Sequence, residues 1–163
     1  MIKDTLLAEF DHELATTRKL ITRVPADKLA WKPHEKSMTL GGLALHIANL
    51  PTWASTILEQ VSFDLDAAPA SLAEPATKAD VVEHFDRSTA AARTALDRTD
   101  AELMAHWTLK RGGQEIFTMP RVAAFRSFVL NHLIHHRGQL SVYLRLNDVP
   151  VPAIYGPSAD EGH

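Results

Sequence analysis

Residues 120–146 read PRVAAFRSFVLNHLIHHRGQLSVYLRL, and this stretch favours one long amphipathic helix. Pro120 suits the first turn of that helix, because its missing N–H would have no intrahelical partner there. Apolar residues follow at three- and four-residue spacing, which is the period of an α-helix. One arc of the helical wheel carries Phe125, Val129, His132, His136, Leu140 and Tyr143. Two histidines therefore lie on the face that a core would bury.

Three further segments repeat this spacing of apolar residues: 2–24, 40–61 and 78–96. Thr39 and Thr77 stand at the start of the second and third segments, where a threonine side chain can cap a helix. Pro51 interrupts the second segment, and a proline inside a helix costs ~3 kcal/mol unless a kink absorbs it. His46 falls within the apolar arc of the same segment. The sequence thus predicts four long helices.

The connections between these helices carry turn-forming residues. Gly112-Gly113 stands between two partly β-prone runs, which predicts a short hairpin. Residues 63–75 are rich in Asp, Ala, Pro and Ser, so we expect a surface loop there. The C-terminal tail holds three prolines and cannot be helical, but its apolar residues and Tyr155 predict that it packs on the helices. We therefore predict an all-α protein, a four-helix bundle forming one domain over residues 1–163, with a hairpin insertion and a packed C-terminal tail.

The composition argues against several classes of function. The formal net charge is −3 and no long basic run occurs, so nucleic acid and anionic membranes are poor partners. The chain has no cysteine, which excludes disulfides, thiolate ligands and a cysteine nucleophile. The N-terminus does not read as a signal peptide, and no uncharged stretch approaches the ~20 residues of a membrane span. We expect a cytoplasmic protein.

Two histidines, His132 and His136, have the spacing of metal ligands. Residues four apart on a helix share a face, with Cβ atoms ~5–6 Å apart, and two such imidazoles can bind one divalent ion at ~2.0–2.1 Å. His46 could supply a third nitrogen and leave positions open for water or substrate. The alternative is that each buried histidine only hydrogen-bonds within the core. Two histidines in one apolar seam make that alternative harder, because each imidazole needs a partner of its own.

Five further residues are candidates for supporting the ligands or lining a pocket: Asn49, Trp53, His135, Gln139 and Tyr143. Asn49 stands one turn from His46 and could orient that imidazole. Leu133 follows the first ligand of the pair, so this is not the His-Glu-x-x-His motif of zinc proteases. We expect Arg137 at a solvated rim. The remaining histidines lack paired spacing, and we expect them at the surface: His12, His34, His84, His106 and His163.

Three segments resemble the DinB-like (DinB/YfiT-like) family of metalloenzymes, named for a DNA-damage-inducible bacterial protein. They are GLALHIANLPTW (42–53), NHLIHHRGQLSVYLR (131–145) and VPAIYGPSADE (151–161). The resemblance spans nearly the whole chain. It implies a four-helix bundle of up-down-down-up order, usually dimeric, in which three histidines hold a divalent ion. Carried over by motif, these ligands are His46, His132 and His136.

The activity that the resemblance implies is less specific, because relatives of this fold include bacillithiol and mycothiol S-transferases and a mycothiol-dependent maleylpyruvate isomerase. We expect one divalent ion, for which Zn²⁺ and Ni²⁺ suit neutral imidazoles, and a small-molecule substrate. An S-transferase without cysteine would use a low-molecular-weight thiol. Metal-assisted hydrolysis is the rival reaction. The alternative outside enzymes is a stress-associated homodimer with a structural ion, to which Asp160 or Glu161 could supply a fourth ligand.

Overall fold

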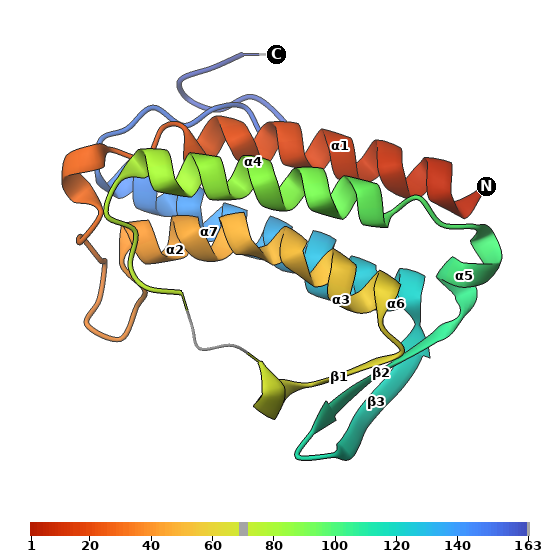
Figure 1. Cartoon of the computed structure of the whole chain (residues 1–163). Coiled ribbons are helices and arrows are strands. Elements are labelled where there is room, and N and C mark those ends of the chain that lie inside the picture. The colour runs from red at the N-terminus through yellow and green to blue at the C-terminus, as the bar shows by residue number, and fades with distance from the viewer. Residues whose placement is uncertain (69–71, 163) are drawn as a thin grey trace.

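The protein is mostly helical, with a small three-stranded sheet below the helices in the view of Figure 1. The computed structural model describes residues 1–68 and 72–162. All four segments predicted from apolar spacing are helical over most of their length. The long helical segments are α1 (Ile2–Ile21), α2 (Leu40–Asn49) followed by α3 (Trp53–Glu59), α4 (Lys78–Ala95), and α6 (Arg121–Phe125) followed by α7 (His132–Leu146).

The long segments lie side by side (Figure 1). α1 and α6–α7 run in one direction, while α2–α3 and α4 run in the other. α4 and α7 each contact both α1 and α2. Phe10, Leu43, Phe85 and Phe125 are fully buried where these helices meet, so the apolar faces found in the sequence form one core.

Both predicted N-caps are confirmed. Thr39 Oγ1 accepts a hydrogen bond from the Gly42 N–H at a nitrogen–oxygen distance of 2.9 Å, at the start of α2. Thr77 forms a capping box with Asp80, in which each side chain accepts from the other residue's backbone N–H at the start of α4. Such caps satisfy N–H groups that the first turn of a helix leaves without partners.

The second helical segment is broken at Pro51. α2 ends at Asn49, and a 3₁₀ turn, η2 (Leu50–Thr52), separates it from α3. The helix predicted over residues 40–61 is therefore divided at the proline for which a kink was considered, and its second part ends at Glu59. Proline has no N–H to donate and its ring clashes with the preceding turn, so the chain tightens into 3₁₀ geometry there.

The segment predicted as one helix over residues 120–146 contains a π-helical stretch, η4 (Arg126–Asn131), between α6 and α7. A π-helix closes its hydrogen bonds five residues apart, so each such turn holds one residue more than an α-helical turn would. The 3.6-residue period does not hold across η4. It resumes in α7, which begins at His132, so His132 and His136 still share a face.

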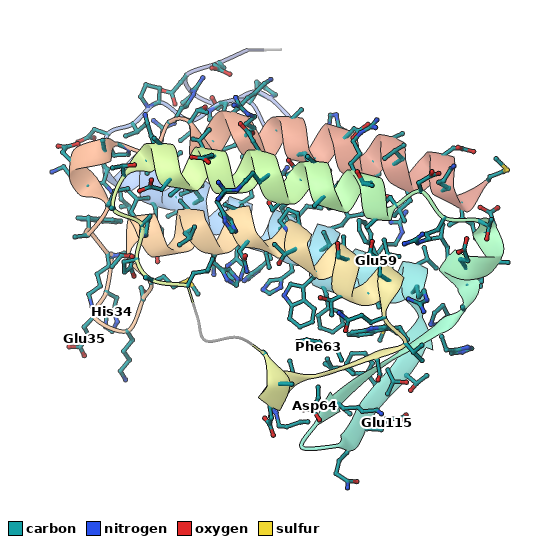
Figure 2. All side chains as sticks on the ribbon, in the orientation of Figure 1. His34, Glu35, Glu59, Phe63, Asp64 and Glu115 are labelled. Atoms are coloured by element: carbon teal, nitrogen blue, oxygen red, sulfur yellow. The ribbon has the colours of Figure 1, made fainter. Side chains whose placement is uncertain are left out.

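The predicted hairpin is formed by β2 (His106–Arg111) and β3 (Gln114–Pro120), which pair antiparallel. Gly112 and Gly113 make its turn with φ of 56° and 78°, a left-handed conformation that glycine adopts without steric cost. The Asp64 carboxylate accepts hydrogen bonds from both glycine N–H groups, at nitrogen–oxygen distances of 3.0 and 2.6 Å. Figure 2 labels Asp64 beside this turn.

A third strand, β1 (Ser62–Asp64), pairs in parallel with β2, with Phe63 opposite Leu109. The sequence predicted a surface loop over residues 63–75, which was wrong for the first of them. A strand of three residues is too short to show an alternating pattern. Residues 69–71 of the predicted loop lie outside the described residues. The connections also hold elements that the sequence did not predict: η1 (Ala26–Lys28), η3 (Leu65–Ala67) and α5 (Asp100–Met104).

Candidate metal centre

The three histidines predicted as ligands come together from two helices. His46 lies on α2, and His132 and His136 lie on α7. The ring centroid of His46 is 5.2 Å from that of His132 and 4.5 Å from that of His136, and the latter two are 4.7 Å apart. Each ring offers a nitrogen, and these three atoms lie within 4.8 Å of one another. Within the described part of the chain, this is the one group of histidine and acidic side chains able to hold a metal ion.

One nitrogen in this cluster argues against an ordinary hydrogen-bonded core. His46 Nε2 is buried and has no hydrogen-bond partner among the described residues. Leaving a buried polar atom without a partner costs ~1–3 kcal/mol. A cation coordinated by the cluster would satisfy this atom, and three imidazoles are a suitable donor set for a divalent transition metal. The residues present therefore fit a metal ion.

Burial lowers the pKa of all three imidazoles. The pKa of His46 falls from 6.5 to about 4, first because the ring is desolvated and then because His136 and His132 disfavour a further positive charge. Burial is also the main cause of the lowered pKa of His132 and of His136, and the neighbouring histidine side chains lower both further. The three rings are therefore uncharged at neutral pH, which is the form that binds metal.

Gln139 orients one of the rings. Its Oε1 lies 2.7 Å from Nδ1 of His136. An amide oxygen can only accept a hydrogen bond, so Nδ1 carries the proton and Nε2 of His136 has the free lone pair. The supporting role predicted for Gln139 agrees with this geometry. His135, by contrast, is exposed and lies beside His136 at a centroid distance of 4.8 Å, outside the three-histidine cluster.

A cavity of about 350 Å³ adjoins His46. It lies between α2 and residues 72–74, and it is lined by Met38, Gly42, Leu45, His46, Asn49, Leu72, Ala73 and Glu74. Glu74 is held at the start of α2, where its carboxylate accepts a hydrogen bond from Thr39 Oγ1 at 2.7 Å. A small organic molecule therefore has room beside the histidine cluster.

Asn49 lines this cavity but does not orient His46 as the sequence predicted. Its Oδ1 lies 2.9 Å from Nε2 of His84, which comes from α4. His84 is half-buried, so its predicted surface position was wrong as well. The other histidines predicted at the surface are exposed, except that His163 lies outside the described residues: His12, His34 and His106.

The two aromatic candidates support the surroundings of the cluster. Trp53 of α3 packs edge-on against Phe63 of β1 at a centroid distance of 5.4 Å, and Figure 2 labels Phe63 below this helix. Tyr143 of α7 packs against Trp31 at 5.5 Å. Its hydroxyl donates a 3.4 Å hydrogen bond to the backbone carbonyl of Met38, which lines the cavity. Trp53 thus joins the sheet to the helices, and Tyr143 braces the cavity wall.

Arg137 is buried, with 1% of its surface exposed, so its predicted position at a solvated rim was wrong. Its guanidinium pairs with the carboxylate of Glu13 on α1 at 2.6 Å and donates to the Tyr155 hydroxyl at 2.8 Å. That hydroxyl in turn donates to the Glu13 carboxylate at 2.9 Å. The tail therefore packs on the helices through Tyr155, as predicted, although the residue as a whole is 64% exposed.

The two acidic side chains of the tail are engaged elsewhere. Asp160 pairs with Arg145 at 2.5 Å and accepts from the Val151 N–H at 2.8 Å, and Glu161 pairs with Arg23. Neither carboxylate belongs to the group of side chains that could hold a metal ion. The possibility that the tail supplies a fourth ligand is therefore contradicted.

Two residues at or next to the cavity were missed at the level of sequence, His84 and Glu74. His84 follows the inward period of α4 between the buried Val81 and Ser88, so its spacing was a usable signal. Glu74 lies in a connection that has no periodic pattern, and nothing in the sequence marked it.

Fold and site together define a class: helical proteins in which a buried cluster of neutral histidines beside a small cavity can hold a metal ion. No helix among the described residues is long and apolar enough to cross a membrane. The chain belongs to the DinB family, whose model matches residues 1–163. The resemblance seen in the sequence is thereby confirmed.

Relatives with known sequences or structures agree with this membership. The chain is 24% identical over 158 residues to the uncharacterized protein YrdA of Bacillus subtilis (strain 168), covering 97% of this chain and 90% of that protein. Its fold is similar to that of a DinB-like protein from Bacillus cereus ATCC 10987, with a TM-score of 0.70, 23% identity, and coverage of 93% of this chain and 97% of the other. The DinB-like protein YjoA of Bacillus subtilis gives a TM-score of 0.67 at 19% identity, with 90% and 96% covered.

Proposed function

We propose that His46, His132 and His136 bind one divalent ion, Zn²⁺ or Ni²⁺, inside a four-helix bundle. The observation that carries this proposal is the buried His46 Nε2, which has no hydrogen-bond partner among the described residues and lies in a cluster of three imidazoles. Neutral imidazole is a good ligand for both metals. The interior of a helix bundle is a common location for such sites.

We further propose that the ion keeps coordination positions open to small molecules. Three imidazoles make up the metal-capable group of the described residues, and the cavity adjoins His46. Structural zinc sites have four protein ligands, whereas catalytic sites keep an open position. A divalent ion held in this way lowers the pKa of a bound water or thiol. Gln139 keeps the proton of His136 on Nδ1. Burial keeps the His46 imidazole in its neutral form, which has a free lone pair on one nitrogen.

The reaction that we propose is transfer of a low-molecular-weight thiol to a small electrophile. The chain has no cysteine, so a thiol must be brought by the substrate. Met38, Leu45 and Leu72 give the cavity an apolar wall suited to an organic electrophile. In the transfer, the thiol S–H bond breaks and a sulfur–carbon bond forms, while the bond between that carbon and its leaving group breaks and the leaving group departs with the bonding electron pair and takes up the proton.

Two alternatives follow from the same site. Metal-assisted hydrolysis would use the same histidines and the same cavity, with water in place of the thiol. A non-enzymatic, stress-associated homodimer would need the ion only for structure. The pairing of Asp160 with Arg145 and of Glu161 with Arg23 disfavours a structural site closed by the tail.

Metal analysis of purified protein tests the site itself. We expect a stoichiometric divalent ion in the wild type and in His135→Ala, because the His135 side chain is exposed and outside the cluster. His136→Ala removes one of three ligands and should lose most of the metal. His135→Ala is a matched control, since it deletes the neighbouring imidazole on the same helix. Equal metal content in His136→Ala and the wild type would contradict the proposal.

The reaction is tested by following the loss of a small electrophile, with and without bacillithiol, mycothiol or glutathione. Thiol transfer requires one of these thiols and gives a thioether product, whereas hydrolysis proceeds without any thiol. Metal-loaded protein that consumes the electrophile at the same rate in the absence of thiols would exclude the transferase and favour the hydrolase. The homodimer, which rests on the resemblance to the family, is tested separately by light scattering after size-exclusion chromatography.

A further inference from the structure

Asn49 lies where α2 ends and on the wall of the cavity beside His46. The side chain is half-buried. Residues three apart on a helix are neighbours, with Cβ atoms ~5–6 Å apart. The Asn49 carboxamide and the His46 imidazole therefore border the same space, one with a hydrogen-bonding group and the other with a candidate metal ligand.

His84 holds one end of this carboxamide. Its Nε2 lies 2.9 Å from Asn49 Oδ1 across the contact between α4 and α2. Burial, and then the nearby Arg87, lowers the pKa of His84, so the ring is neutral at pH 7. The amide oxygen can only accept, so His84 Nε2 donates to it. The bond uses Oδ1 and leaves the donor end, Nδ2, on the other side of the carboxamide.

The remaining cavity wall restricts the kind of molecule that this donor could meet. Met38, Leu45 and Leu72 are apolar, and Glu74 contributes a carboxylate. No lysine or arginine among the described residues lines the cavity. Apart from the proposed ion at His46, an anionic group would gain no positive partner there, and it would be repelled by Glu74. A neutral carbonyl oxygen is the acceptor that matches a neutral N–H donor in such a site.

We propose that Asn49 is a substrate-binding residue, which donates a hydrogen bond from Nδ2 to a neutral carbonyl oxygen of an amide, ester or ketone in the cavity. His84 is a positioning residue: it fixes the carboxamide so that Nδ2, and not Oδ1, meets the ligand. The inference rests on the proposed metal function, because the histidine cluster provides the second point at which the ligand is held. It adds to that function the chemical class of the substrate.

The variant Asn49→Asp separates this role from a structural one. Aspartate keeps an oxygen that can accept from His84, so the link between α2 and α4 is preserved, but it has no N–H to offer a ligand. His84→Gln likewise keeps a donor for Asn49, whereas His84→Leu removes it. If Asn49 only ties two helices together, Asn49→Asp and His84→Gln should both behave like the wild type.

The measurement uses the full chain loaded with Co²⁺, whose visible absorption reports ligand binding at the metal. Two thiols are titrated, both of which bind a metal ion through sulfur: N-acetylcysteamine, which carries a neutral amide carbonyl, and butanethiol, which has none. We expect Asn49→Asp and His84→Leu to weaken the binding of N-acetylcysteamine relative to butanethiol by about two- to tenfold, the effect of losing one hydrogen bond, and His84→Gln to retain wild-type affinity. The ratio to butanethiol removes the effect of the added negative charge, because both thiols place the same thiolate on the metal.

Two outcomes would overturn the inference, and they are distinguishable. If the wild type gives no cobalt absorption, the metal site itself is wrong, and the role of Asn49 fails with it. If cobalt binds normally and the ratio of the two affinities is the same in Asn49→Asp as in the wild type, the metal site stands and only the role of Asn49 is wrong. Melting temperature and cobalt content of each variant establish that it is folded and loaded.

Discussion

Glu13 and Arg137 are in phase with the buried apolar residues of their helices. Glu13 comes three residues after Phe10 on α1, and Arg137 comes four residues after Leu133 on α7. The inward arc predicted for the last helix was centred on His132 and His136, and Arg137 lies about 100° from His136, so we expected Arg137 at a solvated rim. The buried face of α7 is wider than that arc and includes Leu133 and Arg137. Arginine and glutamate are almost never fully buried unless they are paired, and here they pair with each other across two helices.

Replacing Glu13 by alanine should be strongly destabilising. It would leave the Arg137 guanidinium, 1% exposed, without its carboxylate partner. Removing one member of a buried pair costs about 3–5 kcal/mol of unfolding free energy, which urea denaturation would measure. The double variant Glu13→Leu with Arg137→Met is the control, and it should recover part of the loss. A single variant as stable as the wild type would contradict the pairing.

The histidine cluster should make the stability of the metal-free protein depend on pH. The pKa of His46 is about 4 in the folded protein and 6.5 in the reference state. As the pH falls below 6.5, the unfolded chain binds a proton that the folded chain refuses, so the free energy of unfolding decreases until the pH reaches about 4. Above this window His46 contributes no slope. Urea denaturation in the presence of a chelator would show this, and His46→Leu should flatten the curve.

For the helices and strands, the helical spacing of apolar residues and the N-caps could be predicted from the sequence. Departures from regular helix geometry could not. Thr39 and Thr77 marked helix starts correctly because capping depends on neighbours in sequence. Pro51 marked a possible kink, but the 3₁₀ turn that forms there depends on packing around it. No residue type within residues 126–131 signals a π-helix. β1 was missed because its partner, β2, lies far away in the sequence.

Two glycines offer a matched test of helix and turn. At Gly138, in the middle of α7, an added Cβ would meet no atom within 4 Å, so Gly138→Ala should raise the unfolding free energy by about 0.5–1 kcal/mol. At Gly113 space is equally open, but φ is 78°, so Gly113→Ala should lower it by about 1–2 kcal/mol. Thermal denaturation of both variants would check this. If both substitutions changed the unfolding free energy in the same direction, backbone conformation would not be what determines the effect of adding a Cβ.

At the scale of the whole molecule, the tail connects helices that are far apart in sequence. Tyr155 contacts both Glu13 of α1 and Arg137 of α7, and Asp160 and Glu161 pair with Arg145 and Arg23. Proline and tyrosine in the tail predicted that it packs, but they could not say against what. The possibility that Asp160 or Glu161 supplies a fourth metal ligand followed from their carboxyl groups, but the sequence could not show that Arg145 and Arg23 lie close enough to pair with them.

Truncation after Pro150 should therefore lower the melting temperature without lowering metal content. The tail is bonded to the charged pair and not to the histidine cluster. Tyr155→Phe is the finer variant: it keeps the ring over the guanidinium and removes one hydroxyl, which should cost about 1–3 kcal/mol. Differential scanning calorimetry and metal analysis would test both variants. A truncated protein that lost metal but kept the wild-type melting temperature would contradict this prediction.

The π-helical stretch Arg126–Asn131 lets this helix carry one residue more than an unbroken α-helix would, without turning the face of α7. Because the π turn takes up the extra residue, deleting one residue there should restore an α-helical turn and leave His132 and His136 facing His46. Deleting one residue between the two histidines would instead change the angle between their side chains by about 100°, and the cluster would be lost although every histidine was retained. A single-codon deletion is therefore compatible with the site in one stretch of this helix and not in the next. An alignment of relatives can place a one-residue gap within residues 126–131 and still match the same two ligands.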